Sequence, residues 1–322
     1  MKIYQTEFQQ KMAKRPNNLE FNSVAFRRGL ITEKNEVDAF QRSVAGFEGE
    51  QTVLDYFKKY GRRHWIVIPN LWMDYFGSFE CDLVLFTKYK CYPIEIKNYF
   101  GNFTFKEGIS TLNQRHLTVN PVFQARRACS NLQEIFQKEK LTVPIEGSLI
   151  FVGVDNYVQI QSEISNLNIV TRNQLLHFIK KIAVEEDHYA GRSVDWHKIF
   201  PLFSKYETEN SFNPEPFDKE ELLKEARKGI SCKKCHEFIP KANCQTVNCP
   251  CGFQETSEEA ILRTIAEFGV LTFKQDFTLN EILTFMDGQF SKTYLREQVS
   301  QHFLKVGNGR YTQYRFKEKL AK

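Results

Sequence analysis

The chain contains 322 residues, of which 42% are hydrophobic and 26% are charged, and its formal net charge is +5 at pH 7. A chain of this length favours two or three domains over one. It has no low-complexity tract, no apolar run long enough to cross a membrane and no signal-peptide pattern, so we expect a globular cytoplasmic protein without a membrane partner. The net charge is too small to indicate a partner by itself, and the distribution of charge matters more.

The first part of the chain predicts a helix with an unusual face. Residues 1–39 are mixed in charge, and we expect them to be an N-terminal extension that wraps the domain after it. Helical periodicity then runs from about Val37 to Phe57. Within it, Gly46 and Gly49 leave one face nearly bare, which predicts a close approach of this helix to a sheet.

A β-hairpin follows this helix. Residues 62–69 predict a first strand and residues 71–78 a loop. Two short runs rich in apolar and β-favouring residues come next, at 80–86 and 91–97. The polar residues 87–90 between them predict the loop of a hairpin.

The hairpin brings three charged side chains to one face. In the expected register Asp82 lies directly opposite Glu95, and strand alternation puts Lys97 on the same face. Charges inside apolar strands are unfavourable unless they are paired or bind a metal. Asp82 and Glu95 are therefore candidate ligands of Mg²⁺ or Mn²⁺, and Lys97 would stabilise negative charge on an attacking water or a phosphate. The alternative is a solvated sheet edge with an ordinary salt bridge.

These residues resemble a known family. Asp82 with Glu95-Ile96-Lys97 is similar to the PD-(D/E)xK nuclease motif, although Cys81 stands where that motif often carries proline. The wider series of motifs resembles the NERD (nuclease-related) domain over roughly residues 40–155. It comprises Gly46-Phe47-Glu48-Gly49-Glu50, Asp82, Glu95-Ile96-Lys97, Asn120-Pro121 and Gln124.

The resemblance implies a fold and further site residues. It implies a restriction-endonuclease-like α/β fold, a mixed sheet flanked by helices, which we place in residues 40–200. It also implies that Glu50 is a third carboxylate of the metal site and that Gln124 faces the active site. A surface position is the alternative for Glu50.

Further elements complete the predicted domain. Strands are expected at 100–105, 112–119, 147–154 and 167–170, and helices from Pro121 to about Lys138 and from Arg172 to about Ala183. Arg126 and Arg127, on the first of these helices, could contact a backbone phosphate or simply line a solvated face. Residues 201–230 predict a linker followed by a charged connecting helix.

The cysteines form two populations. Cys81, Cys91 and Cys129 lie in apolar contexts and are expected to be buried thiols, whereas five more fall between residues 232 and 251. In a cytosolic chain such clustering favours a metal over disulfides.

Residues 231–255 look like a zinc ribbon. The expected ligands of a structural Zn²⁺ are Cys232, Cys235, Cys249 and Cys251. The second pair is one residue shorter than C-x-x-C, so Cys244 is a substitute for one of them, and His236 is a weaker one. A structural metal is favoured over a catalytic one because four thiolates leave no open coordination position.

Residues 256–322 predict three helices and a hairpin, an arrangement that resembles a winged helix-turn-helix. Such domains bind nucleic acid, and some mediate protein contacts instead. The candidate nucleic-acid contacts on the third helix and the hairpin are Lys292, Arg296, Lys305, Arg310, Arg315 and Lys317.

The sequence therefore supports one main hypothesis and two alternatives. The main hypothesis is a metal-dependent nuclease that hydrolyses phosphodiester bonds, with DNA as the expected substrate and the C-terminal modules holding it. The first alternative is a non-catalytic DNA-binding or DNA-processing accessory protein that uses a nuclease-like domain for recognition. The second is a regulator in which that domain serves only as a scaffold.

Overall fold

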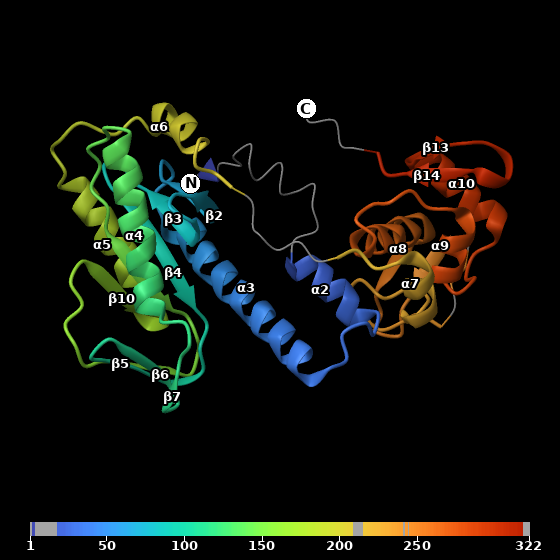
Figure 1. The fold of residues 1–322 in the computed structure, drawn as a ribbon, viewed down its shortest axis with the longest axis horizontal. Coiled ribbons are helices and arrows are strands. Elements are labelled where there is room, and N and C mark those ends of the chain that lie inside the picture. Colours follow the sequence, from blue (N-terminus) through green and yellow to red (C-terminus); the bar gives the residue numbers. More distant parts are fainter. Residues whose placement is uncertain (1, 4–17, 209–214, 241, 244, 318–322) are drawn as a thin grey trace. The chain divides into compact units, whose positions relative to one another are not determined.

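The computed structural model describes residues 2–3, 18–208, 215–240, 242–243 and 245–317 (Figure 1). The chain forms two compact units. Unit 1 comprises residues 1–12 and 42–211, and unit 2 comprises residues 13–41 and 212–322. None of the helices in the described part of the chain is both long and apolar enough to span a membrane.

Unit 1 is built on a mixed six-stranded sheet with the order β1-β2-β3-β4-β8-β10. Strands β2, β3 and β4 are antiparallel neighbours, whereas β1, β8 and β10 each pair in parallel with the strand beside them. The strands are β1 (Lys2–Ile3), β2 (Ile66–Asp74), β3 (Ser78–Phe86), β4 (Cys91–Lys97), β8 (Gly147–Phe151) and β10 (Leu167–Thr171).

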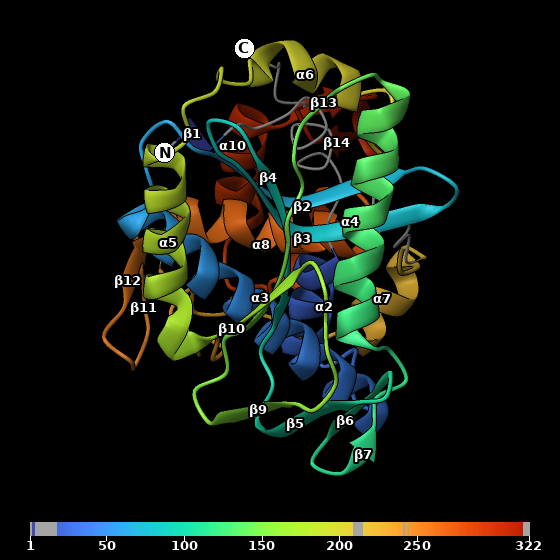
Figure 2. The same ribbon diagram turned by 90° about the vertical axis from the view of Figure 1, so that its left-hand side faces the viewer.

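Helices cover both faces of this sheet, as Figures 1 and 2 show. Val53, Leu54 and Phe57 of α3 (Lys34–Tyr60) and the apolar side of α5 (Leu175–Asp187) pack on the face that carries Leu83 and Ile94. The opposite face packs against α4 (Pro121–Lys138) and α6 (Trp196–Phe203). The short helix η1 (Arg172–Gln174) leads into α5.

A second, four-stranded sheet has the order β7-β6-β5-β9. Its strands are β5 (Gly101–Lys106), β6 (Ile109–Leu112), β7 (Arg115–His116) and β9 (Asn156–Ile160). Phe103 and Phe105 of β5 pack against Leu149 and Val122, which joins this sheet to α4 and β8. The nuclease-like α/β fold expected from the sequence, a mixed sheet flanked by helices, is confirmed.

Two predicted elements of unit 1 differ from the structure. The sequence predicts a loop at residues 71–78, but β2 continues to Asp74, β3 starts at Ser78, and only three residues form the turn. It also predicts one strand at residues 112–119, but Asn113 and Gln114 adopt positive φ angles and form the turn between β6 and β7. In both places the alternation typical of a β-strand is present in the sequence, but the turn lies at a different position from the predicted one.

Unit 2 contains a further helix from the N-terminal part of the chain, α2 (Asn18–Arg27). Its Phe21, Val24 and Ala25 belong to the same apolar core as the C-terminal helices. The sequence predicts that residues 1–39 wrap the nuclease-like domain, whereas most of the described part of that segment belongs to unit 2. The remaining elements of unit 2 are α7 (Lys219–Glu225), β11 (Thr246–Asn248), β12 (Gln254–Thr256), α8 (Ser257–Leu271), α9 (Leu279–Phe285), α10 (Lys292–His302), β13 (Leu304–Val306), η2 (Gly309–Tyr311) and β14 (Gln313–Arg315).

A buried arginine fastens α2 to the rest of unit 2. Arg28 is fully buried, and its Nη2 atom lies 2.5 Å from Oε2 of Glu267 on α8. Its Nη1 atom donates to the carbonyl oxygens of Arg227 and Gly229, at 3.0 and 2.8 Å. The guanidinium also lies over the ring of Phe285, 4.2 Å from its centroid. Because removing either partner would leave a buried charge, loss of Arg28 or Glu267 is expected to destabilise the packing of this segment strongly.

Candidate active site and metal centre

The β3–β4 hairpin has the predicted register. Leu83 pairs with Ile94, and one step further along this register Asp82 stands opposite Glu95. The side chain of Asp82 accepts a hydrogen bond from the backbone N–H of Ile96 at 2.7 Å, which fixes the carboxylate against β4. Glu95 is only 6% exposed.

Lys97 joins these two carboxylates. Its Nζ atom lies 2.6 Å from Oε1 of Glu95. Burial alone would lower the pKa of Lys97, but the charges of Glu95 and Asp82 outweigh burial and raise that pKa. The predicted acid-acid-lysine group is therefore assembled, and Lys97 stays protonated at neutral pH.

Helix α3 brings Glu50 to the same place because Gly49 lets the helix approach the sheet. A Cβ atom on Gly49 would lie 2.8 Å from Cβ of Asn98 and 3.1 Å from Cγ1 of Val152. Asn98 also donates to the carbonyl oxygen of Ala45 at 2.8 Å, which binds α3 to the segment after β4. Gly46 meets nothing within 4 Å, so the expectation that both glycines permit the contact is wrong for Gly46.

Two residues of the site were missed by the sequence analysis. Glu80 lies two positions before Asp82 on β3, so strand alternation puts it on the same face, and this signal was present in the sequence. Asn70 of β2 has a positive φ of 50°, and its side chain lies close enough to Glu50 to lower the pKa of that carboxyl group, against the larger effect of burial. Nothing in the sequence marked Asn70, because its partner lies on a helix distant along the chain.

The acidic groups raise one another's pKa values. Burial, followed by the charge of Asp82, raises the pKa of Glu50 to about 7, and burial with the charge of Glu50 raises the pKa of Glu80 to about 7. Burial and the charge of Glu95 raise the pKa of Asp82 to about 8. Four carboxyl groups with one lysine thus form a site that gains from an added positive charge.

Helix α4 carries the other expected residues of the nuclease-like domain. Asn120 caps the helix by accepting the N–H of Val122 at 3.0 Å. Gln124 and Arg126 are half-buried on its first turns, and Arg127 donates to the carbonyl oxygen of Ser78 at 2.8 Å. Arg127 therefore braces the start of β3, with part of its guanidinium exposed.

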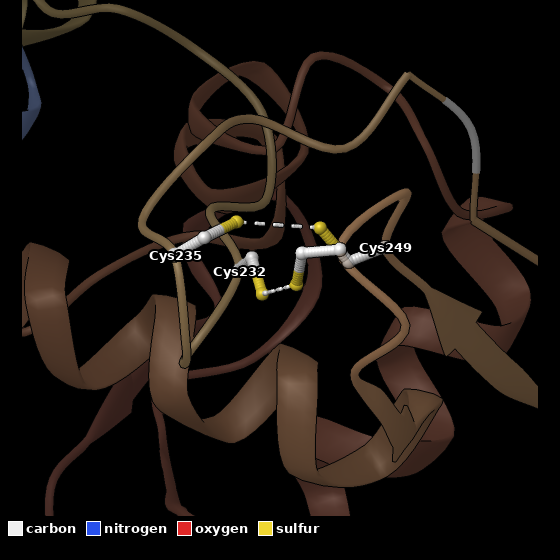
Figure 3. A group of neighbouring side chains, drawn as sticks. Cys232, Cys235 and Cys249 are labelled. Carbon is white, nitrogen blue, oxygen red and sulfur yellow. Dashed lines mark hydrogen bonds between the residues drawn. The ribbon is translucent and has the colours of Figure 1, made fainter.

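The four predicted cysteines of unit 2 come together. The sulfur atoms of Cys232, Cys235, Cys249 and Cys251 all lie within 4.8 Å of one another, and Figure 3 shows those of the three labelled cysteines converging. Among the described residues this is the only group of three or more potential metal-ligating side chains that is so close. Cys244, the predicted substitute, lies outside the described residues.

The chemistry of this group suits a metal. Four sulfur atoms gathered in this way match the thiolate set that zinc ribbons use. Burial raises the pKa of Cys232, but backbone N–H groups of Cys235 and Lys234 outweigh it and lower that pKa to about 7. The hairpin of β11 and β12 follows the first cysteine pair and carries Cys249 and Cys251 in its turn. The group fits a zinc ribbon.

The residues of the C-terminal hairpin that we expect to contact nucleic acid differ from one another in how they are paired and exposed. Arg315 makes two hydrogen bonds to Asp276, from Nε at 2.8 Å and from Nη2 at 2.7 Å. Lys317 donates to a carbonyl oxygen of α10 at 2.9 Å, and Lys305 is exposed. The side chain of Arg310 lies outside the described residues.

The two expected contacts on α10 both lie at the surface. Lys292, at the start of the helix, donates to Oδ1 of Asn280 at 2.8 Å. Arg296 is exposed one turn further on, beside the exposed Glu297. Positive charge on this helix is thus accompanied by one acidic neighbour.

The mixed sheet with helices on both faces and an acid-lysine group at one edge of a hairpin define a nuclease-like α/β domain. Residues 45–152 match the family model of the nuclease-related domain, NERD, so this part of the chain is a NERD domain. The match begins in α3 and ends just after β8, and it includes Glu50, Asp82, Glu95 and Lys97. No curated protein and no solved structure matched the chain.

Proposed function

We propose that this protein is a metal-dependent nuclease that hydrolyses phosphodiester bonds, with DNA as its substrate. The observation that carries the proposal is the assembly of Asp82, Glu95 and Lys97 on one face of the β3–β4 hairpin, with Glu50 and Glu80 beside them. A protein that used this domain only for recognition would have no need to keep all of these groups.

The donor set fits a hard divalent cation. Mg²⁺ takes one or two protein carboxylates and keeps water and phosphate oxygens in its other positions, which suits Asp82 and Glu95 as holding residues and Glu50 as an additional one. The raised pKa values of Glu50 and Asp82 support this assignment, because a bound cation would offset the repulsion that raises them. When bound, Mg²⁺ or Mn²⁺ would polarise the phosphate and lower the pKa of a bound water.

The residues of the chain would supply charge and position. Lys97 is held beside Glu95 and would stabilise negative charge on the phosphate. The hydrogen bond from the Ile96 N–H holds Asp82 in place, and the side chain of Asn70 lies beside Glu50. Gln124 is half-buried on α4. By resemblance to related nucleases, we expect it to orient the groups around it.

The catalytic proposal is tested with labelled single-stranded, double-stranded and forked DNA in Mg²⁺ or Mn²⁺. Wild type is expected to cleave at least one of these DNAs, and Glu95→Ala and Lys97→Ala are each expected to lower the rate by about 100-fold or more, because each removes a charge that acts in the transition state. Lys58→Ala is the matched control, since Lys58 forms an exposed ion pair on α3.

Binding without cleavage would contradict the catalytic proposal. If wild type binds these DNAs but leaves them intact in either metal, the catalytic proposal is wrong. The domain would then be a recognition module of a DNA-processing accessory protein.

We further propose that the C-terminal modules hold the nucleic acid. The helices α8, α9 and α10 are followed by the antiparallel pair β13–β14, and Phe277 forms a β-bridge with Tyr314 of β14. Three helices and a small sheet in this order resemble a winged helix-turn-helix in which the β13–β14 hairpin is the wing. This resemblance supports the wing and α10 as the contact surface. The four-cysteine group would hold a structural Zn²⁺ in the same unit.

Alanine at Lys305, Arg310 and Arg315 together is expected to lower DNA affinity and to flatten its salt dependence, by about one unit of slope for each phosphate that is no longer neutralised. Lys305 is expected to contribute more than Arg315, whose guanidinium is already paired with Asp276. Fluorescence anisotropy over a salt series measures both quantities, with Lys198→Ala in unit 1 as the control. Unchanged binding by the triple variant would exclude the wing from the interface.

A further inference from the structure

The strands β2 and β3 extend beyond the candidate active site. Their ladder runs outward to the pair Asp74–Ser78, whereas the ladder between β3 and β4 starts only at Leu83. Residues 71–81 therefore form a two-stranded hairpin arm that has no contribution from β4. Figure 2 shows the turn of this arm extending past α4. Since Glu80 and Asp82 lie at its base, the arm leads directly from the acidic site.

The hairpin arm is braced on two sides. Backbone hydrogen bonds join it to the segment after α6, from the N–H of Asp74 to Tyr206 at 2.7 Å and from the N–H of Thr208 to Trp72 at 3.1 Å. On the other side Arg127 of α4 donates to the carbonyl oxygen of Ser78 at 2.8 Å. The arm is thus held in one position by unit 1 itself.

The tip of the arm carries an aromatic side chain that folding does not explain. Phe76 is 93% exposed, the highest value among the exposed large hydrophobic residues of the described chain. Its φ angle is +51°, in the left-handed region that a bulky residue rarely adopts, and Gly77 follows with φ +111°. A turn alone would favour glycine or asparagine at position 76. A strained, exposed phenylalanine therefore indicates a role in binding.

The surroundings of the tip favour a nucleic acid as the partner. The ring of Tyr75 lies 4.7 Å from that of Phe76, and Lys138 lies over the Tyr75 ring at 5.3 Å from its centroid. Arg127, exposed and bonded to the carbonyl oxygen of Ser78 next to the tip, adds a second cation. Aromatic rings flanked by cations are the groups on which unpaired bases stack while phosphates are neutralised.

We propose that the tip of the hairpin arm stacks through Phe76 on an unpaired base of the nucleic acid whose strand enters the candidate active site. The inference rests on the proposed nuclease function and gives it a substrate class, a single strand or a single-stranded end. In duplex DNA the bases are stacked on one another and their faces are covered, so duplex binding would not involve Phe76.

The test compares binding of a labelled single-stranded oligonucleotide and a labelled duplex to the full-length protein in EDTA, by fluorescence anisotropy. Phe76→Ala is expected to weaken single-strand binding by roughly 5- to 150-fold, the range for loss of one stacked base, with duplex binding unchanged. Phe76→Trp is expected to restore binding and to show quenching of its added fluorescence by the single strand. Tyr157→Ala is the matched control, since Tyr157 is an exposed aromatic residue of β9.

A second variant separates function from folding. Phe76→Gly removes the left-handed strain, so it is expected to raise the Tm while weakening single-strand binding as much as Phe76→Ala does. If wild type binds single strands and both variants bind them equally well, the inference is wrong and the proposed function stands. Equal weakening of single-strand and duplex binding would also overturn stacking. If wild type binds no single strand, the inference is wrong, and if it also leaves every DNA uncut in Mg²⁺ or Mn²⁺, the proposed function fails as well.

Discussion

Cys249→Ser is expected to abolish metal binding by the four clustered cysteines of unit 2 and to unfold this segment locally. The four sulfur atoms lie within 4.8 Å of one another, and β11 and β12 contain only three residues each, too few to hold this segment without a metal. Metal binding in such ribbons supplies folding free energy on the order of 10 kcal/mol. Because Cys232, Val247 and Cys249 belong to the core of unit 2, exposure of the adjacent apolar surface should follow.

The measurement is hydrogen exchange of the amides of β11 and β12, with metal content determined in parallel. Wild type treated with a strong chelator should resemble Cys249→Ser. Cys129→Ser, a thiol of unit 1, should keep the metal, and so should Cys244→Ser if the four clustered sulfurs are the ligands. Slow exchange of these amides in a metal-free protein would show that the ribbon folds without a metal.

Gly49→Ala is expected to disable the candidate active site, whereas Gly46→Ala is expected to be harmless. A Cβ atom at position 49 would lie 2.8 Å from Asn98, so α3 must shift away from the sheet and take Glu50 with it. Overpacking of this kind costs about 1–3 kcal/mol, and a misplacement of about 1 Å at a reacting group can lower a rate about 100-fold. A Cβ atom at position 46 meets nothing, and alanine there should stabilise the helix by about 0.5–1 kcal/mol.

Thermal unfolding and cleavage rates of the two variants check this prediction. Because both changes are glycine to alanine on one helix, any difference between them reflects the contact with Asn98 and not helix propensity. Equal activity of the two variants would mean that Glu50 acts without close packing of α3 or does not act at all.

The sequence allowed the local parts of the site to be predicted. Asp82, Glu95 and Lys97 lie within one hairpin, so strand alternation and loop length were enough to place them on one face. Glu80 obeys the same alternation and was overlooked because the family motif does not include it. Asn70 could not be found in this way, because its contact with Glu50 joins a strand and a helix that are separated along the chain.

The errors have a common physical cause. In the sequence, Pro69 and Asn70 look like the end of a strand. Strand β2 nevertheless continues, because Leu71 and Met73 are buried in the core of unit 1. Likewise, the local sequence around Phe21 and Arg28 does not indicate which of the two units these residues pack into. Tertiary contacts determine both the length of β2 and the unit that α2 joins, and these contacts cannot be predicted from a local sequence pattern.

The buried contact between Arg28 and Glu267 also has a consequence for the order of events during synthesis. It joins a residue made early to one made late, so unit 2 is discontinuous in the chain and the NERD domain is an insertion within it. On the ribosome the NERD domain can fold as soon as its own residues have emerged, while α2 must wait for α8. Cleavage of the chain between residues 208 and 215 would not yield a complete C-terminal unit, because the fragment would lack Arg28 and leave Glu267 without this partner.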